Sequence, residues 1–132
     1  MILVDTDVMI DIFREYSPAI AWLHSLGNEE INLPGFVAME LIQGCRNKDE
    51  LEKIERELEP YAVIWPTPEI CDRALSVFSS YRLSHGLGII DVLIGQMAAS
   101  LNTPFHTFNQ KHYAAIPGLR TVQPYEKGSL SS

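Results

Sequence analysis

The sequence has few cysteines, no long apolar run and a shortage of positive charge. Its two cysteines, Cys45 and Cys71, lack the spacing of a zinc motif, and two thiols do not make a disulfide framework. No stretch approaches the roughly 18 apolar residues that a membrane-spanning helix needs, and the chain opens on a strand pattern instead of a secretory leader. These absences favour a cytoplasmic protein without a membrane partner.

Basic residues are outnumbered, with 10 lysines and arginines against 17 aspartates and glutamates, and the net charge is −7. This balance argues against a broad basic face that holds nucleic acid by itself. Any contact with nucleic acid has to be local or assisted by a metal ion. An acidic surface also favours a basic protein partner, although acidity by itself keeps proteins soluble.

The chain has 132 residues, 46% of them hydrophobic, which suits one compact domain with a real core. We expect this domain to span residues 1–125. The polar stretch EKGSLSS, residues 126–132, is expected to form a flexible tail.

Apolar runs and helix start signals alternate along the chain. Strands are expected at 2–4, 31–33, 61–65, 103–108 and 120–125, and helices at 8–13, 17–27, 36–44, 47–59, 67–85 and 89–101. Such alternation predicts an α/β fold, an α/β/α sandwich with a mostly parallel central sheet of about five strands. In such folds the functional crevice lies outside the carboxyl ends of the strands.

Three short polar residues, Asp5, Thr6 and Asp7, follow the first apolar run. We expect Thr6 or Asp7 to open the next helix, and either aspartate could serve only as a cap. A cap needs one short polar residue, however, and three stand here in a row. The surplus favours a functional site at the end of this strand.

Two further acids, Glu40 and Asp91, interrupt helices that otherwise have the composition of a core. An ionised carboxylate in such a place is costly unless it is paired or bound to a metal ion. Glu40 stands one turn from Gly44, which leaves space beside the carboxylate. Asp91 lies in the first turn of its helix, where the helix dipole favours negative charge, so a structural role is a rival explanation for that residue alone.

A cluster of carboxylates forms a hard, all-oxygen site that suits Mg²⁺ or Mn²⁺ better than zinc. Such ions neutralise phosphate charge and lower the pKa of a bound water for in-line attack. An acidic protein can therefore act on an anionic phosphodiester.

Four stretches stand together in one order and spacing: LVDTDVMID (3–11), VAMELIQG (37–44), HGLGIIDVLIGQMA (85–98) and TFNQKHYAAIPGL (107–119). In these stretches the sequence resembles the PIN-domain nucleases, and among them the VapC-type toxins of bacterial and archaeal toxin-antitoxin pairs. The resemblance implies that Asp5, Glu40 and Asp91 are catalytic and bind the metal ion. It also implies a supporting set of Thr6, Asp7, Thr107 and Asn109.

Asn109 occupies the fourth acidic position of the family, where many members carry aspartate. Its amide can ligate or orient water but brings no charge, so a second metal ion would be held more weakly. His112 stands at the family's histidine position, and we expect it to pack or cap. Other cations near the site are Arg14, Arg46, Arg82 and Lys111, and no spacing singles one of them out.

The resemblance further implies an endoribonuclease that uses Mg²⁺, with Mn²⁺ able to substitute, and cuts RNA such as tRNA or rRNA. It implies a homodimer silenced by a cognate antitoxin whose basic C-terminal segment lies along the toxin. Two alternatives remain open. One is a haloacid-dehalogenase-like phosphatase with Asp5 as phosphoacceptor, although the later lysine and closely spaced acidic pair of that mechanism are missing. The other is a catalytically weakened PIN module that only binds a partner.

Overall fold

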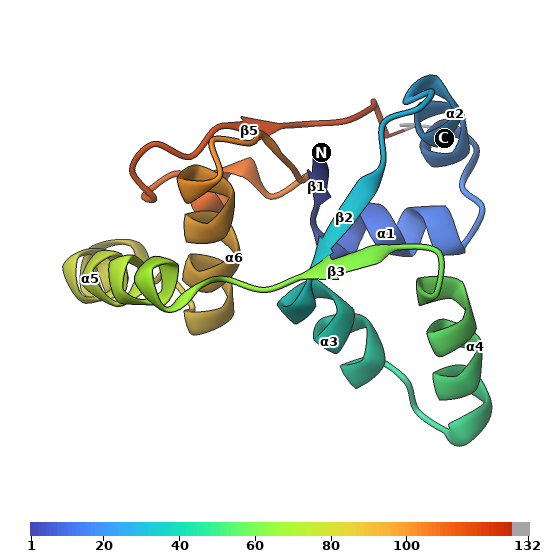
Figure 1. The fold of residues 1–132 in the computed structure, drawn as a ribbon, viewed down its shortest axis with the longest axis horizontal. Coiled ribbons are helices and arrows are strands. Elements are labelled where there is room, and N and C mark those ends of the chain that lie inside the picture. Colours follow the sequence, from blue (N-terminus) through green and yellow to red (C-terminus); the bar gives the residue numbers. More distant parts are fainter. Residues whose placement is uncertain (128–132) are drawn as a thin grey trace.

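The computed structural model describes residues 1–127 of the chain. Five strands form one sheet in the order β3-β2-β1-β4-β5, and every neighbouring pair is parallel (Figure 1). The strands are β1 (Ile2–Val4), β2 (Ile31–Pro34), β3 (Ala62–Ile64), β4 (Phe105–His106) and β5 (Thr121–Val122). The predicted α/β fold with a parallel sheet of about five strands is confirmed.

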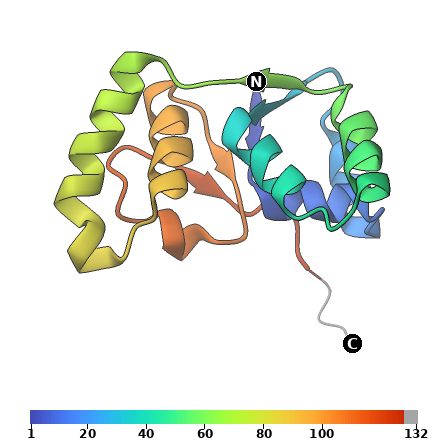
Figure 2. The same ribbon diagram turned by 90° about the horizontal axis from the view of Figure 1, so that it is seen from below.

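Six α-helices and one short 3-10 helix connect these strands within residues 1–127. They are α1 (Thr6–Phe13), α2 (Ser17–Ser25), α3 (Gly35–Gln43), α4 (Lys48–Leu58), α5 (Pro68–His85), α6 (Ile89–Ser100) and η1 (Gln110–Tyr113). Helices α5 and α6 pack together at one end of the molecule, α4 lies at the opposite end, and α3 lies between them (Figures 1 and 2).

The core forms around β1, which is the central strand. Leu3 and Val4 are completely buried because β2 and β4 flank the strand and helices cover it. A strand buried on both faces needs a continuous apolar run, and ILV supplies one. The chain turns polar at Asp5, where β1 ends.

Helix α1 begins at Thr6, two residues before the expected start at Val8. Its N-cap is Asp5, which has extended backbone angles and accepts the Thr6 N–H on its own carboxylate at 2.8 Å. The N-cap is therefore Asp5, the capping role that the sequence left open for either aspartate, and not Thr6 or Asp7. Both of these side chains bond instead to distant parts of the chain, Thr6 to α3 and Asp7 to the segment after β4.

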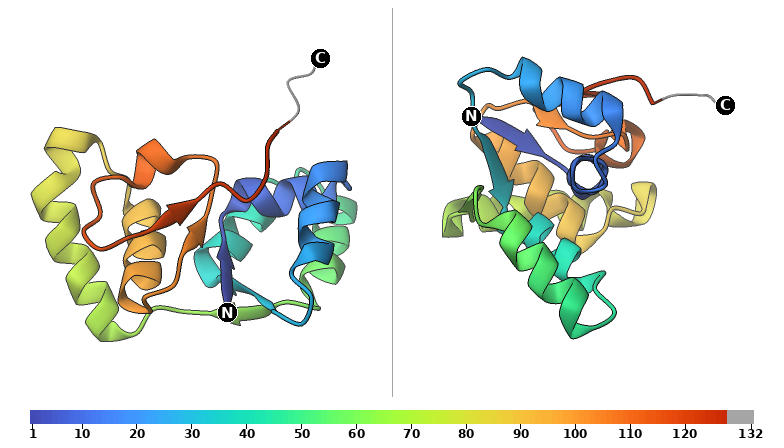
Figure 3. Two further views of the ribbon diagram at one scale, coloured as in Figure 1. Left: turned by 90° about the horizontal axis from the view of Figure 1, so that it is seen from above. Right: turned by 90° about the vertical axis from the view of Figure 1, so that its right-hand side faces the viewer.

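The chain after β5 runs toward α1 and α2 (Figure 3). The Tyr125 hydroxyl donates to Asp11 at 2.8 Å, and the Lys127 ammonium lies 3.2 Å from the same carboxylate. The predicted tail starts at residue 126, and its residues 128–132 lie outside the described part of the chain. Within residues 1–127, no helix has the length and hydropathy to cross a bilayer.

Candidate functional site

Asp5 is the most buried of the predicted site residues that carry charge, at 5% exposure. Its backbone N–H donates to the His106 carbonyl of β4, which holds it at the carboxyl end of β1. Its Oδ2 accepts two hydroxyls, from Thr107 at 2.8 Å and Tyr113 at 3.2 Å. Burial raises the pKa of Asp5, and the charge of Asp91 adds a smaller rise, while the hydrogen bonds oppose it.

Thr6 links Asp5 to Glu40. Its backbone N–H donates to Asp5 Oδ1, and its hydroxyl donates to Glu40 Oε1 at 2.6 Å. Glu40 comes from α3, which packs against α1. One threonine therefore bonds two of the three acids that the sequence assigned to the metal ion.

Asp91, on α6, is bonded to a residue of η1. Its Oδ2 lies 2.6 Å from His112 Nε2, and the next residue, Tyr113, donates to Asp5. A Cβ on Gly88, the residue before α6, would lie 2.8 Å from the same Asp91 oxygen, so a larger residue there would displace this carboxylate. The pair His112 and Tyr113 therefore connects Asp91 to Asp5.

Sequence reasoning missed both of these residues. It expected His112 to pack or cap, yet the ring bonds a predicted metal ligand. Tyr113 is buried, but it follows a run of exposed polar residues, and nothing in that run indicates that its hydroxyl reaches Asp5. The only available signal is their position just after Asn109 in one of the family-like stretches.

Asp7 holds the segment after β4. Its Oδ2 accepts the Phe108 N–H at 3.0 Å and the Asn109 side-chain amide at 3.4 Å. The Asn109 N–H in turn donates to the buried Thr107 hydroxyl at 3.0 Å. Burial, followed by the charge of Asp5, raises the pKa of Asp7 to about 6. Asp7 Oδ1 is buried and has no hydrogen-bond partner within residues 1–127.

The carboxylates are neighbours, but they do not converge on one point. Among the described residues, no three His, Cys, Asp or Glu side chains are placed to hold a metal ion. All three acids lie near the Tyr113 hydroxyl. Burial raises the pKa of this phenol, and the charges of Asp5, Asp91 and Glu40 raise it further. The acids thus share one electrostatic environment, while Glu40 accepts a hydrogen bond from Thr6 and Asp91 bonds to His112.

A family model for the PIN domain matches residues 2–117. The chain belongs to the PIN domain family. A comparison of the sequence with curated proteins gave no match.

Solved structures share the fold over nearly the whole chain. A toxin-antitoxin complex from Klebsiella pneumoniae is 24% identical with a TM-score of 0.74, covering 96% of this chain and 100% of that one. VapBC-1 from nontypeable Haemophilus influenzae is 26% identical with a TM-score of 0.75, covering 94% and 98%. DNA-bound VapBC from Salmonella typhimurium is 20% identical with a TM-score of 0.77, covering 92% and 98%.

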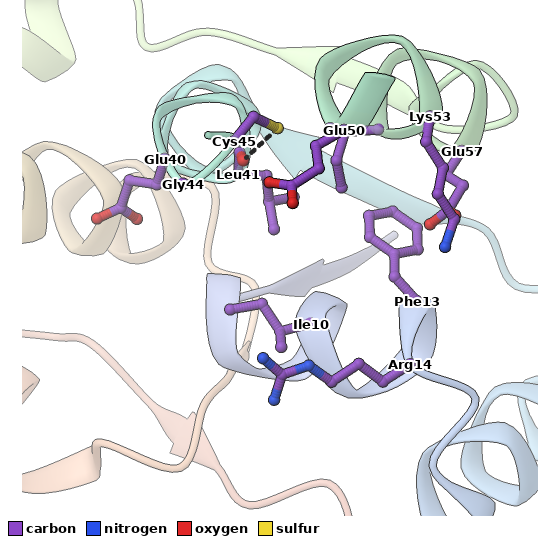
Figure 4. A pocket seen from close by; sticks show the side chains of 11 residues that line it. Ile10, Phe13, Arg14, Glu40, Leu41, Gly44, Cys45, Glu50, Lys53 and Glu57 are labelled. Carbon is purple, nitrogen blue, oxygen red and sulfur yellow. Dashed lines mark hydrogen bonds and ion pairs between the residues drawn. The ribbon is translucent and has the colours of Figure 1, made fainter. Parts of the chain in front are cut away.

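Two clefts of this PIN domain meet at Glu40. The first, of about 470 Å³, lies beside the start of α6 and is also lined by Asp91 and Arg82. The second, of about 320 Å³, lies among α1, α3 and α4. Figure 4 shows Phe13 and Glu57 at one end of the second cleft and Glu40 at the other.

Proposed function

We propose that this PIN domain is a metal-dependent endoribonuclease that cleaves RNA, such as tRNA or rRNA, in the cytoplasm. Asp5, Glu40 and Asp91 are the proposed catalytic residues and metal ligands. The observation that carries the proposal is the bonded network just described, because it ties acids from β1, α3 and α6 to one strand end. A purely structural role for each acid would not require them to share a network.

The donor chemistry fits Mg²⁺, with Mn²⁺ as a substitute, because the acids offer only oxygen ligands. Hydrogen bonds within residues 1–127 use Glu40 Oε1 and Asp91 Oδ2, and they leave Glu40 Oε2 and Asp91 Oδ1 without a donor. The raised pKa of Asp5 also fits, since a cation would favour its ionised form. When bound, such an ion lowers the pKa of a water and neutralises phosphate charge.

The supporting residues have separate proposed roles. Thr107 and Thr6 hold the Asp5 carboxylate in one orientation. Asp7 and Asn109 fix the segment that carries Thr107. Because Asn109 is uncharged and donates its amide to Asp7, we expect one ion to bind more tightly than a second.

We also propose that the protein is a VapC-type toxin with a cognate antitoxin. Three of its structural neighbours are toxin-antitoxin or VapBC complexes. The cleft among α1, α3 and α4 has apolar walls such as Phe13 and Ile54. Its charged lining residues are three acids and two bases, Glu40, Glu50, Glu57, Arg14 and Lys53, so the acids are in excess. An apolar helix followed by a basic C-terminal segment suits this surface, and the shared wall at Glu40 lets that segment reach the acids.

The remaining part of the proposal is a homodimer. Large apolar side chains are exposed on α5, with Leu83 at 98% and Leu75 at 67% exposure. Exposed apolar side chains close together are typical of association surfaces.

The deciding experiment is cleavage of total cellular RNA by purified, antitoxin-free protein. We expect discrete products with Mn²⁺, and none with EDTA or with Asp5→Asn, which removes a charge but little volume. Asp72→Asn, an exposed acid on α5, is the matched control and should cleave as the wild type does. Cleavage by Asp5→Asn, or cleavage in EDTA, would overturn the proposed mechanism.

A further inference from the structure

The cleft of about 470 Å³ beside α6 contains one cationic side chain, judged over residues 1–127. Two of its lining residues, Glu40 and Asp91, carry carboxylates, and Arg82 carries the only positive charge. The net charge of the protein is −7, so little else attracts a polyanion to this place. A phosphodiester that enters this cleft meets two groups that repel it and one that attracts it.

The Arg82 side chain has a defined position. It lies in the last turn of α5, and its Nη1 donates to the Leu87 carbonyl at 3.1 Å. This bond spans the turn that leads to α6 and Asp91, and Gly86 begins the turn with a left-handed φ of 63°. A guanidinium has five N–H donors, and this bond uses one. The others remain available for a ligand.

No ion pair within the described residues includes Arg82, although it shares the cleft with Glu40 and Asp91. Of the other basic side chains near the site, Arg46 pairs with Glu50 at 3.0 Å, and the His112 ring bonds to Asp91 at 2.6 Å. Arg14 and Lys111 do not line this cleft. An arginine that lines a carboxylate cleft without pairing to either acid has its positive charge free for a ligand.

We propose that Arg82 is a substrate-positioning residue that binds a backbone phosphate of RNA in this cleft. The planar guanidinium suits two phosphate oxygens at once, which a lysine ammonium does not. The bond to Leu87 reduces the side-chain freedom that binding has to remove. This inference rests on the proposed nuclease function, because it assigns the substrate's phosphate a place beside the proposed metal ligands.

Arg120 provides a matched control. It is exposed, as Arg82 is, and its guanidinium also donates to a backbone carbonyl, that of Asn102, at 3.1 Å. It does not line the cleft. If RNA affinity falls in Arg82→Gln but not in Arg120→Gln, the cause is the position of Arg82 in the cleft. A general loss of one positive charge would weaken binding in both variants.

The test measures the binding of labelled bulk tRNA in the presence of Mg²⁺. Each arginine variant is made in the Asp5→Asn protein, so that binding is measured without cleavage. Arg82→Gln should raise the Kd about 10- to 100-fold, the range for a lost charged hydrogen bond. It should also reduce the slope of log binding constant against log salt by about 0.7–0.9, the value of one phosphate contact. Arg82→Lys should recover the salt slope but only part of the affinity. Arg120→Gln should change neither.

Cleavage kinetics in the otherwise wild-type chain separate this role from a structural one. Arg82→Gln should raise KM with a smaller change in kcat, and its melting temperature should match that of Arg82→Lys. An unchanged Kd and salt slope in Arg82→Gln would overturn the inference while leaving the nuclease proposal intact. If the wild type neither binds nor cleaves RNA, the nuclease proposal itself fails.

Discussion

The Thr107 hydroxyl offers the sharpest test of how the site is held together. Thr107 is completely buried; its Oγ1 donates to Asp5 Oδ2 at 2.8 Å and accepts the Asn109 N–H at 3.0 Å. Thr107→Val keeps the shape and removes both bonds. A hydrogen bond to a charged group contributes about 1.5–3 kcal/mol, and a neutral one about 1 kcal/mol. We therefore expect a loss of about 2–4 kcal/mol in the free energy of unfolding.

For a domain of this size, about 1 kcal/mol corresponds to roughly 3–5 °C in melting temperature, so the expected fall is about 6–20 °C. The assay is thermal unfolding followed by circular dichroism at pH 7 with EDTA. Thr107→Ser keeps the hydroxyl and should recover most of the loss. Thr103→Val is the control, because that hydroxyl is exposed and donates only to the Leu101 carbonyl at 3.1 Å.

The pH dependence of the loss gives a second check. The Thr107 hydrogen bond lowers the pKa of Asp5, so it favours the ionised carboxylate. The difference in the free energy of unfolding between wild type and Thr107→Val should therefore become smaller in acid, where Asp5 is protonated. A loss no larger than that of Thr103→Val, or a loss that does not change with pH, would refute the role assigned to this hydroxyl.

Three further outcomes are expected. Saturating Mn²⁺ at 100 times its Kd should stabilise the wild type by about 2.7 kcal/mol and Asp5→Asn much less; equal melting shifts would contradict the assigned ligands. Because the pKa of Asp7 rises from 3.8 to about 6 on folding, the protonated form contributes stability below pH 3.8 that is lost as pH rises through 6. Asp7→Asn in EDTA should thus stabilise the protein by about 1–2 kcal/mol at pH 8, after allowance for solvent screening, and little at pH 4; urea unfolding at both pH values measures this. Gly88→Ala should push the Asp91 carboxylate off His112 and reduce cleavage at least about tenfold, with melting nearly unchanged; full activity would show that this contact is dispensable.

Much of the fold follows from local patterns in the sequence. The run ILV predicted a strand buried on both faces, and the structure confirms it. Thr67 caps α5 by accepting the Ile70 N–H, as its position before a proline indicated. Strand ends were less predictable. Strand β4 covers only Phe105–His106, and not the expected 103–108. The Thr107 N–H still donates to the Val122 carbonyl of β5, but the following N–H groups, of Phe108 and Asn109, donate to the side chains of Asp7 and Thr107.

The candidate acids could be found from the sequence because each one is anomalous where it stands. Asp5 follows a buried strand, and Glu40 and Asp91 interrupt apolar helices, so burial makes each of them costly without a partner. Residue type and local context were sufficient for this inference. The same context left the cations near the site equivalent, since nothing local distinguishes Arg82 from Arg14 or Lys111.

Only the tertiary structure decided which groups meet. The parallel order places β1 between β2 and β4, and this brings Thr6 to Glu40 and Tyr113 to Asp5 across 34 and 108 residues of chain. It also places Arg82 in the cleft of Glu40 and Asp91. A local pattern fixes what a residue costs to bury, whereas the contact that offsets this cost depends on how distant segments pack. The sequence by itself therefore determined the elements and the anomalous acids, and packing determined their partners.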